Sequence, residues 1–127
     1  MEIIAKPPTF KGPGDNFTGD VYGDLITPPG SQLTVAAVHF APGARTAWHS
    51  HDGGQTLYVT EGRGLVQSRG GKIVQIRSGD ALHAPDGEEH WHGAAPDTYM
   101  THLTITNGTA HWGPQVTDDE YQGSRHP

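Results

Sequence analysis

The 127-residue sequence contains no cysteine, which excludes disulfide bonds and any metal site built on thiolates. Positive charge is also scarce, because eight lysines and arginines stand against fourteen aspartates and glutamates, for a formal net charge of −6. No basic cluster is present to neutralise phosphates, so the sequence argues against a nucleic-acid partner. The net charge says little about a small substrate, since a bound metal ion can dominate the local charge.

Long hydrophobic runs are absent as well, and none approaches the length that spans a membrane. The first six residues lack the cationic and apolar pattern of a signal peptide. We therefore expect a cytoplasmic protein with no membrane partner, and the lack of cysteine is compatible with a reducing compartment.

The sequence does have 18 glycines and 10 prolines, which suit many short strands joined by tight turns. Its length predicts one domain over residues 1–127, with the barrel in 33–112. Regular strand spacing and the lack of long helical periodicity favour an antiparallel β-sandwich or barrel. The predicted strands cover residues 33–40, 55–60, 64–68, 72–76, 80–84, 90–94 and 100–106, with a turn at 61–64.

The two ends of the chain have a different pattern. Residues 1–30 are predicted to form an arm, over 1–16, followed by a short strand pair over 17–26. The arm is a candidate to pair with the sheet edge of a neighbouring subunit. Near the other end, Thr117-Asp-Asp-Glu120 has the pattern of a capping box and predicts one short helix.

Three histidines and a glutamine lie at spacings that predict one metal site. His49 and His51 are two residues apart on a predicted strand, so both side chains point to the same face. A glycine-rich bend follows, and Gln55 returns on the next strand. A second turn, Pro85-Asp-Gly87, delivers His90 to the start of a further strand. Imidazole is the commonest metal ligand, and an amide oxygen can complete the set.

These two clusters resemble the paired motifs of the cupin superfamily. The first family motif aligns a glycine, a His-x-His pair, an acid and a second glycine; the second aligns a glycine, Pro-x-Gly and a histidine. The residues in register are Gly43, His49, His51 and Gly62, then Gly79, Pro85, Gly87 and His90. Gln55 stands where most cupins have glutamate, and Ala94 replaces the usual asparagine. The resemblance implies an all-β protein, a single jelly-roll type antiparallel barrel, with one bound divalent metal.

A narrower resemblance runs from about residue 33 to 121. Segments such as 43–49, 90–96 and 100–103 are similar to small bacterial cupins that include the manganese-dependent hydroxynitrile lyases. These enzymes split cyanohydrins into an aldehyde and hydrogen cyanide and catalyse the reverse addition. The resemblance implies Mn²⁺ and a homodimer or homotetramer, although histidine and amide ligands also accept Fe²⁺, Co²⁺, Ni²⁺ and Zn²⁺.

Four neutral ligands would leave a divalent ion its full charge, which favours Lewis-acid chemistry over high-valent iron oxidants. Such chemistry needs a general base, and two histidines are candidates. His92 shares the strand face of His90, and His102 lies on the following strand. Either is also explained as a packing histidine. The candidate substrate pocket, if Phe40 faces inward, consists of Ala36, Val38, Phe40 and Thr106, which core packing would explain equally well.

The remaining histidines and the tryptophans have other predicted roles. His39 is predicted on the outer face of its strand, His83 mostly outside the pocket, and His111 and His126 in solvent. Trp48 and Trp91 are expected to pack as core or interface residues.

Three functions are consistent with these features. A metal-dependent hydroxynitrile lyase acting on a small molecule is the first. A small cupin dioxygenase would instead consume oxygen, and a non-catalytic binding cupin would bind a ligand without turnover. The sequence shows no attached DNA-binding segment, which counts against a regulator.

Overall fold

The computed structural model describes residues 1–123, and His126, whose exposure was predicted, lies outside the described residues. Within residues 1–123, twelve strands and one helix follow one another. Their bounds are β1 Phe10–Lys11, β2 Phe17–Thr18, β3 Val21–Leu25, β4 Leu33–Phe40, β5 Arg45–Thr46, β6 His49–His51, β7 Gln55–Ser68, β8 Val74–Arg77, β9 Ala81–Ala84, β10 His90–Ala94, β11 Met100–Asn107, β12 Ala110–Trp112 and α1 Asp118–Gln122.

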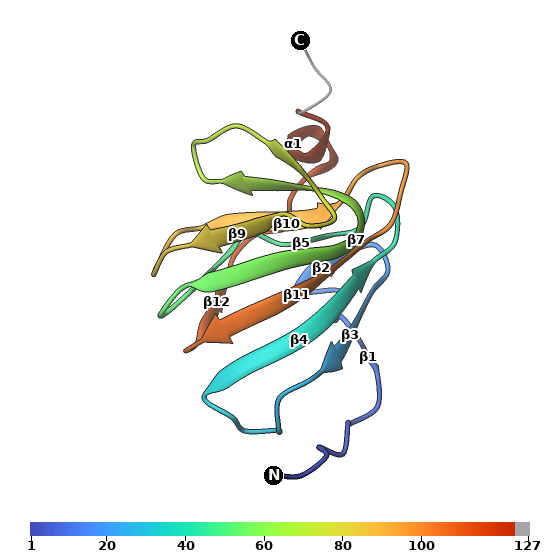
Figure 1. Ribbon diagram of the computed structural model, residues 1–127. Helices are drawn as coiled ribbons and strands as arrows, with labels where there is room; N and C mark the ends of the chain where they lie inside the picture. The colour runs from blue at the N-terminus through green and yellow to red at the C-terminus, as the bar shows by residue number, and fades with distance from the viewer. Residues whose placement is uncertain (124–127) are drawn as a thin grey trace.

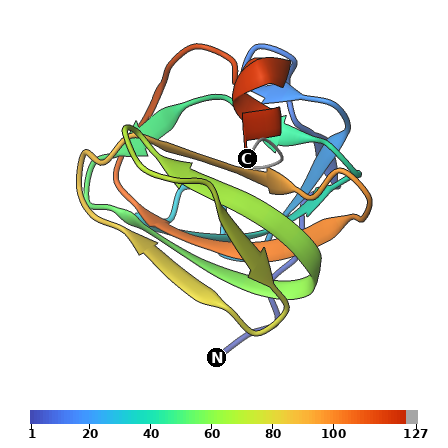
Figure 2. The same cartoon turned by 90° about the horizontal axis from the view of Figure 1, so that it is seen from above.

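The strands curl around a common interior as two antiparallel layers that share strand β7 (Figures 1 and 2). One layer has the order β1-β3-β4-β11-β7, with β9 also on β7. The other runs from β7 through β10 to β5 and β2, with β6 and β12 beyond β10. The predicted all-β antiparallel barrel with a short C-terminal helix is therefore confirmed. No helix among residues 1–123 is long and apolar enough to cross a membrane.

Strand β7 is continuous, so the turn predicted at residues 61–64 is wrong. The glycines there serve close packing between the layers. A Cβ on Gly62 would lie 2.0 Å from the carbonyl oxygen of Tyr99, and one on Gly64 would lie 2.2 Å from Met100 Sδ. The pairing of β7 with β11 shifts register between Thr101 and His102. Glycine at these positions lets one long strand bend from the first layer into the second.

The strand pair predicted over residues 17–26 is also wrong. Strands β2 and β3 do form, but β2 pairs with β5 in one layer while β3 pairs with β4 in the other. The N-terminal arm is tied down at its end, because β1 pairs with β3. Ahead of it the chain stays exposed, with Ile3 fully accessible.

Helix α1 is held against the second layer by a buried arginine. Its predicted capping box is present, with Thr117 and Glu120 bonding each other's backbone nitrogens. Arg45 donates to the Val116 carbonyl and pairs with Asp118 at 2.8 Å. Trp48 and Trp91 are buried in the adjoining core, as predicted.

The outer face of the first layer carries exposed apolar side chains. Tyr22, Leu33 and Tyr58 are each more than 40% accessible. His39 lies on this face too, bonded to Asp24 and Thr101, in agreement with its predicted outward position. The homodimer or homotetramer stays a prediction, and a second copy would bury apolar surface here.

Candidate metal centre

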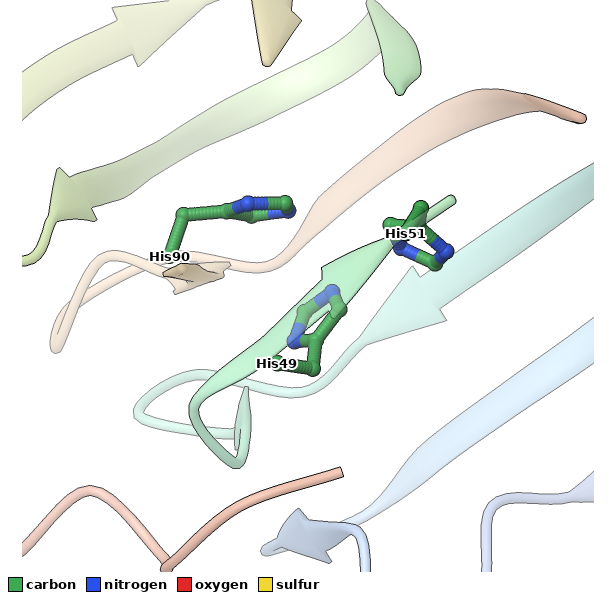
Figure 3. A group of neighbouring side chains, drawn as sticks. All are labelled: His49, His51 and His90. Carbon is green, nitrogen blue, oxygen red and sulfur yellow. The ribbon is translucent and has the colours of Figure 1, made fainter. Parts of the chain in front are cut away.

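Three histidines from two neighbouring strands converge inside the barrel. His49 and His90 are directly opposite each other in the β6–β10 pairing, and His51 follows two residues later on β6. One ring nitrogen of each lies within 4.8 Å of the other two. All three are buried, and Figure 3 shows their rings turned toward a common space.

Gln55 completes this cluster from the other layer. It begins β7, and its Oε1 lies 3.1 Å from His90 Nε2. Its side-chain nitrogen donates to Thr106 Oγ1 at 3.1 Å, which orients the amide oxygen toward the histidines. The structure thus brings together the four residues that the sequence predicts as metal ligands.

Backbone carbonyls select which ring nitrogen of two histidines faces the cluster. His49 Nδ1 lies 2.8 Å from the Ala47 carbonyl oxygen, and His90 Nδ1 lies 2.9 Å from that of Glu88. A carbonyl only accepts, so each Nδ1 carries the proton and each Nε2 keeps a free lone pair. This arrangement is typical of metal-binding histidines, whose second nitrogen is held by a carbonyl or carboxylate.

Two further observations fit a cation in the cluster. With Nδ1 protonated, the lone pair of neutral His90 Nε2 faces the Gln55 oxygen, so two acceptors oppose each other. His51 has both ring nitrogens buried without a hydrogen-bond partner among the described residues. Buried polar atoms in this state are costly unless a cation or water satisfies them. The four residues could therefore hold a divalent metal ion.

Burial keeps the clustered imidazoles neutral, which is the form that binds metal. It lowers the pKa of His49 to about 3, with a further contribution from the charge of His90. The pKa of His51 falls to about 4 for the same two reasons. Burial also lowers the pKa of His90.

The two candidate base histidines form a buried pair beside the cluster. His92 Nδ1 lies 2.9 Å from His102 Nε2. The His92 ring is 5.1 Å from that of His49, whereas His102 packs behind it against Phe40. His92 Nε2 has no hydrogen-bond partner among the described residues. His92 therefore lies next to the cluster, and His102 reaches it through His92.

The buried His102 predicts an acid-sensitive fold. Burial lowers its pKa to about 4 from 6.5, so the unfolded chain takes up a proton before the folded one does. The contribution of neutral His102 to the free energy of unfolding is therefore fully present above pH 6.5 and is lost as the pH drops toward 4. The loss from this residue is roughly 2 kcal/mol at pH 5. Urea unfolding of the metal-free proteins at pH 7.5 and 5.0 measures the drop in the free energy of unfolding between the two pH values. This drop should be smaller in His102→Gln than in the parent protein by roughly 2 kcal/mol. Equal losses in both proteins would contradict the prediction.

The candidate pocket residues lie on the inner face of the first layer. Phe40 is buried against His92 and His102, so the condition that it faces inward is met. Val38 is opposite His102 in the β4–β11 pairing, and Ala36 is opposite Thr104. Thr106 touches the cluster through its bond to Gln55. Their role in binding substrate stays a prediction.

Two cavities bear on where a substrate could bind. The larger, about 770 Å³, is lined by residues such as Arg63, Arg77 and Asp97 and by no histidine. It is remote from the cluster, and its size alone does not make it the active site. A smaller cavity of about 60 Å³ is bounded directly by Gln55 and His90.

Sequence reasoning missed one neighbour of the cluster. Trp112 is opposite His49 in the β12–β6 pairing, and their rings are 4.7 Å apart. Only the register of a three-residue edge strand reveals this contact. His83 and His111 are exposed, bonded to Thr56 and Asp52, and neither joins the cluster.

Comparison with known proteins decides the family. A model of the cupin domain matches residues 36–106, which contain all four clustered residues. The chain belongs to the cupin family. A solved cupin-like protein from Thermotoga maritima is 39% identical, with a TM-score of 0.87 over 98% of this chain and 97% of that one.

One curated cupin relative carries an activity in its name. The (R)-mandelonitrile lyase of Granulicella tundricola is 49% identical over 130 residues, covering 96% of this chain and 99% of the relative. A cupin 2 conserved barrel domain protein from Rhodopseudomonas palustris, 17% identical with a TM-score of 0.70, shares the fold. It covers 89% of this chain and 79% of that one.

Proposed function

We propose that this cupin is a metal-dependent hydroxynitrile lyase, which cleaves an aromatic cyanohydrin to an aldehyde and hydrogen cyanide and runs the reverse addition. The observation that carries the proposal is the buried cluster of His49, His51, Gln55 and His90 with the His92–His102 pair beside it. The 49% identity to a mandelonitrile lyase over nearly the whole chain supports this choice among cupin activities. It also favours an enzyme over a binding protein.

His49, His51, His90 and the Gln55 oxygen would hold the metal, and Mn²⁺ is the proposed ion. When bound, a divalent cation with four neutral ligands supplies Lewis acidity toward an oxygen of the substrate. The chain's own contribution is to hold these donors in place before binding, through the carbonyls of Ala47 and Glu88.

The His92–His102 pair handles the proton. His92 accepts the hydroxyl proton of the cyanohydrin at Nε2, which is its unpartnered nitrogen. The bond between the carbinol carbon and the nitrile carbon then breaks, and its electron pair leaves with cyanide. His92 returns the proton to cyanide, giving hydrogen cyanide and the aldehyde. His102 orients His92 through the 2.9 Å contact, and Phe40 packs against both rings and keeps water away.

The direct test is cyanide release from racemic mandelonitrile. Protein of known metal content, measured by mass spectrometry, is compared with the same protein stripped of metal. We expect release from the manganese-loaded form, with an acceleration of at least about a hundredfold over stripped protein. No release from fully loaded protein would refute the proposal. Oxygen uptake with a catechol or diketone would then favour a dioxygenase, and saturable binding without turnover a binding cupin.

A further inference from the structure

The small cavity beside the cluster has a composition that the sequence does not reveal. It lies between β7, β9 and β10, and we call it the side chamber. Leu57, Val66 and Leu82 form its apolar walls, and Gln55 and His90 line it beside the cluster. Further polar residues also line it, namely Gln67, Ser68, His83 and Glu88. Leu57 is opposite Leu82 in one layer, and Val66 is opposite His92 in the other. The chamber therefore occupies the gap where the two halves of β7 diverge.

The chamber reaches solvent past polar residues. Ser68, at the exposed end of β7, donates to Glu88 at 2.8 Å, and both line the chamber. A ligand inside would thus contact His90 and Gln55 and still have a short route out. Ala36 and Val38 lie elsewhere, on β4, which is separated from β7 by β11.

The size of the chamber limits its ligand. A volume of about 60 Å³ is well below the roughly 300–1,000 Å³ of ordinary ligand pockets. It equals the space of about two water molecules. A phenyl ring does not fit in this volume, but a linear group of two or three atoms does.

We propose that the side chamber binds the nitrile group of the substrate and, after cleavage, hydrogen cyanide, a ligand class that rests on the proposed function. The aryl group then lies outside the chamber, which is too small for it. In the reverse addition, the site would therefore select cyanide over longer nucleophiles, because a longer linear group would clash with Leu57, Val66 or Leu82.

Ala84 offers a test by filling the chamber. It lines the chamber and is opposite Gln55, whereas Ala81 on the same strand is opposite Tyr58 and exposed on the outer face. Cyanide binding is measured by the visible spectrum of Co²⁺-loaded protein. We expect Ala84→Leu to raise the Kd for cyanide roughly tenfold or more, with Ala81→Leu unchanged. In the synthetic direction, Ala84→Leu should raise the KM for cyanide and leave the KM for benzaldehyde unchanged.

A second variant keeps the test decisive if Ala84→Leu fails to fold. Leu82→Ala enlarges the chamber, so thiocyanate, a longer rod than cyanide, should gain affinity relative to the parent protein. Unchanged affinities for cyanide in Ala84→Leu and for thiocyanate in Leu82→Ala, with both proteins folded, would overturn the proposal. Weakened cyanide binding in Ala84→Leu without mandelonitrile cleavage by the parent protein would support the chamber and refute the lyase instead.

Discussion

Replacing His51 by alanine is expected to abolish metal binding and lyase activity without weakening the metal-free fold. His51 differs from His49 and His90 because neither of its ring nitrogens has a partner among the described residues. Removing it takes away a ligand, while its polar neighbour Gln55 keeps its hydrogen bond to Thr106, so the metal-free fold loses little hydrogen-bond energy. We expect Mn²⁺ affinity to fall by more than about a hundredfold, since loss of outer-sphere partners alone costs 10- to 100-fold. Cyanide release should fall accordingly.

Calorimetric titration with Mn²⁺ and thermal unfolding with and without the ion measure both parts of this result. The parent protein should gain stability on binding, and His51→Ala should not. His111→Ala is the matched control, because His111 lies on the neighbouring strand, is exposed and is bonded to Asp52. One Mn²⁺ bound by His51→Ala as tightly as by the parent protein would remove His51 from the proposed site.

Replacing His92 by glutamine should lower kcat by about 10²- to 10⁴-fold while the metal stays bound, because a general base is lost. His102→Gln should lower kcat too, through the orientation of His92, although His102 does not touch the cluster rings. Since the two act as one unit, the double variant should be little worse than His92→Gln alone. KM for mandelonitrile should change little in all three.

Steady-state kinetics across pH, with the metal content of each variant assayed, separates this role from a structural one. A positioning role for His102 predicts a shifted pH profile of kcat in His102→Gln, which mere packing would not produce. His111→Gln is the matched control, because His111 is exposed, is bonded to Asp52 and stands outside the His92–His102 pair. Full activity in His92→Gln would exclude His92 as the general base. If the loss of kcat in the double variant equalled the product of the two single losses, the two histidines would act independently.

Much of the site was predictable because its signals are local. A two-residue spacing on a strand places His49 and His51 on one face, and Pro85-Asp-Gly87 sets the entry of His90. The capping box at Thr117 is equally local and is confirmed. These patterns depend on strand alternation and turn chemistry, which a few adjacent residues specify.

The errors arose where glycine has two meanings. Gly62 and Gly64 were interpreted as a turn, yet they let β7 approach Tyr99 and Met100 closely while it passes between the layers. Likewise, β2 and β3 are adjacent in sequence but pair with different layers. Nothing local distinguishes a hairpin from a chain that crosses between two sheets, because the partner strands are distant in sequence.

By itself, the sequence determined the all-β class, the residue types of the metal cluster and the two candidate bases. It did so because strand alternation and turn propensity act over a few residues. Only the tertiary structure decided that His92 lies between His102 and the cluster, that Trp112 packs on His49, and that a chamber opens beside His90. These depend on the register between distant strands and on how the two layers diverge along β7.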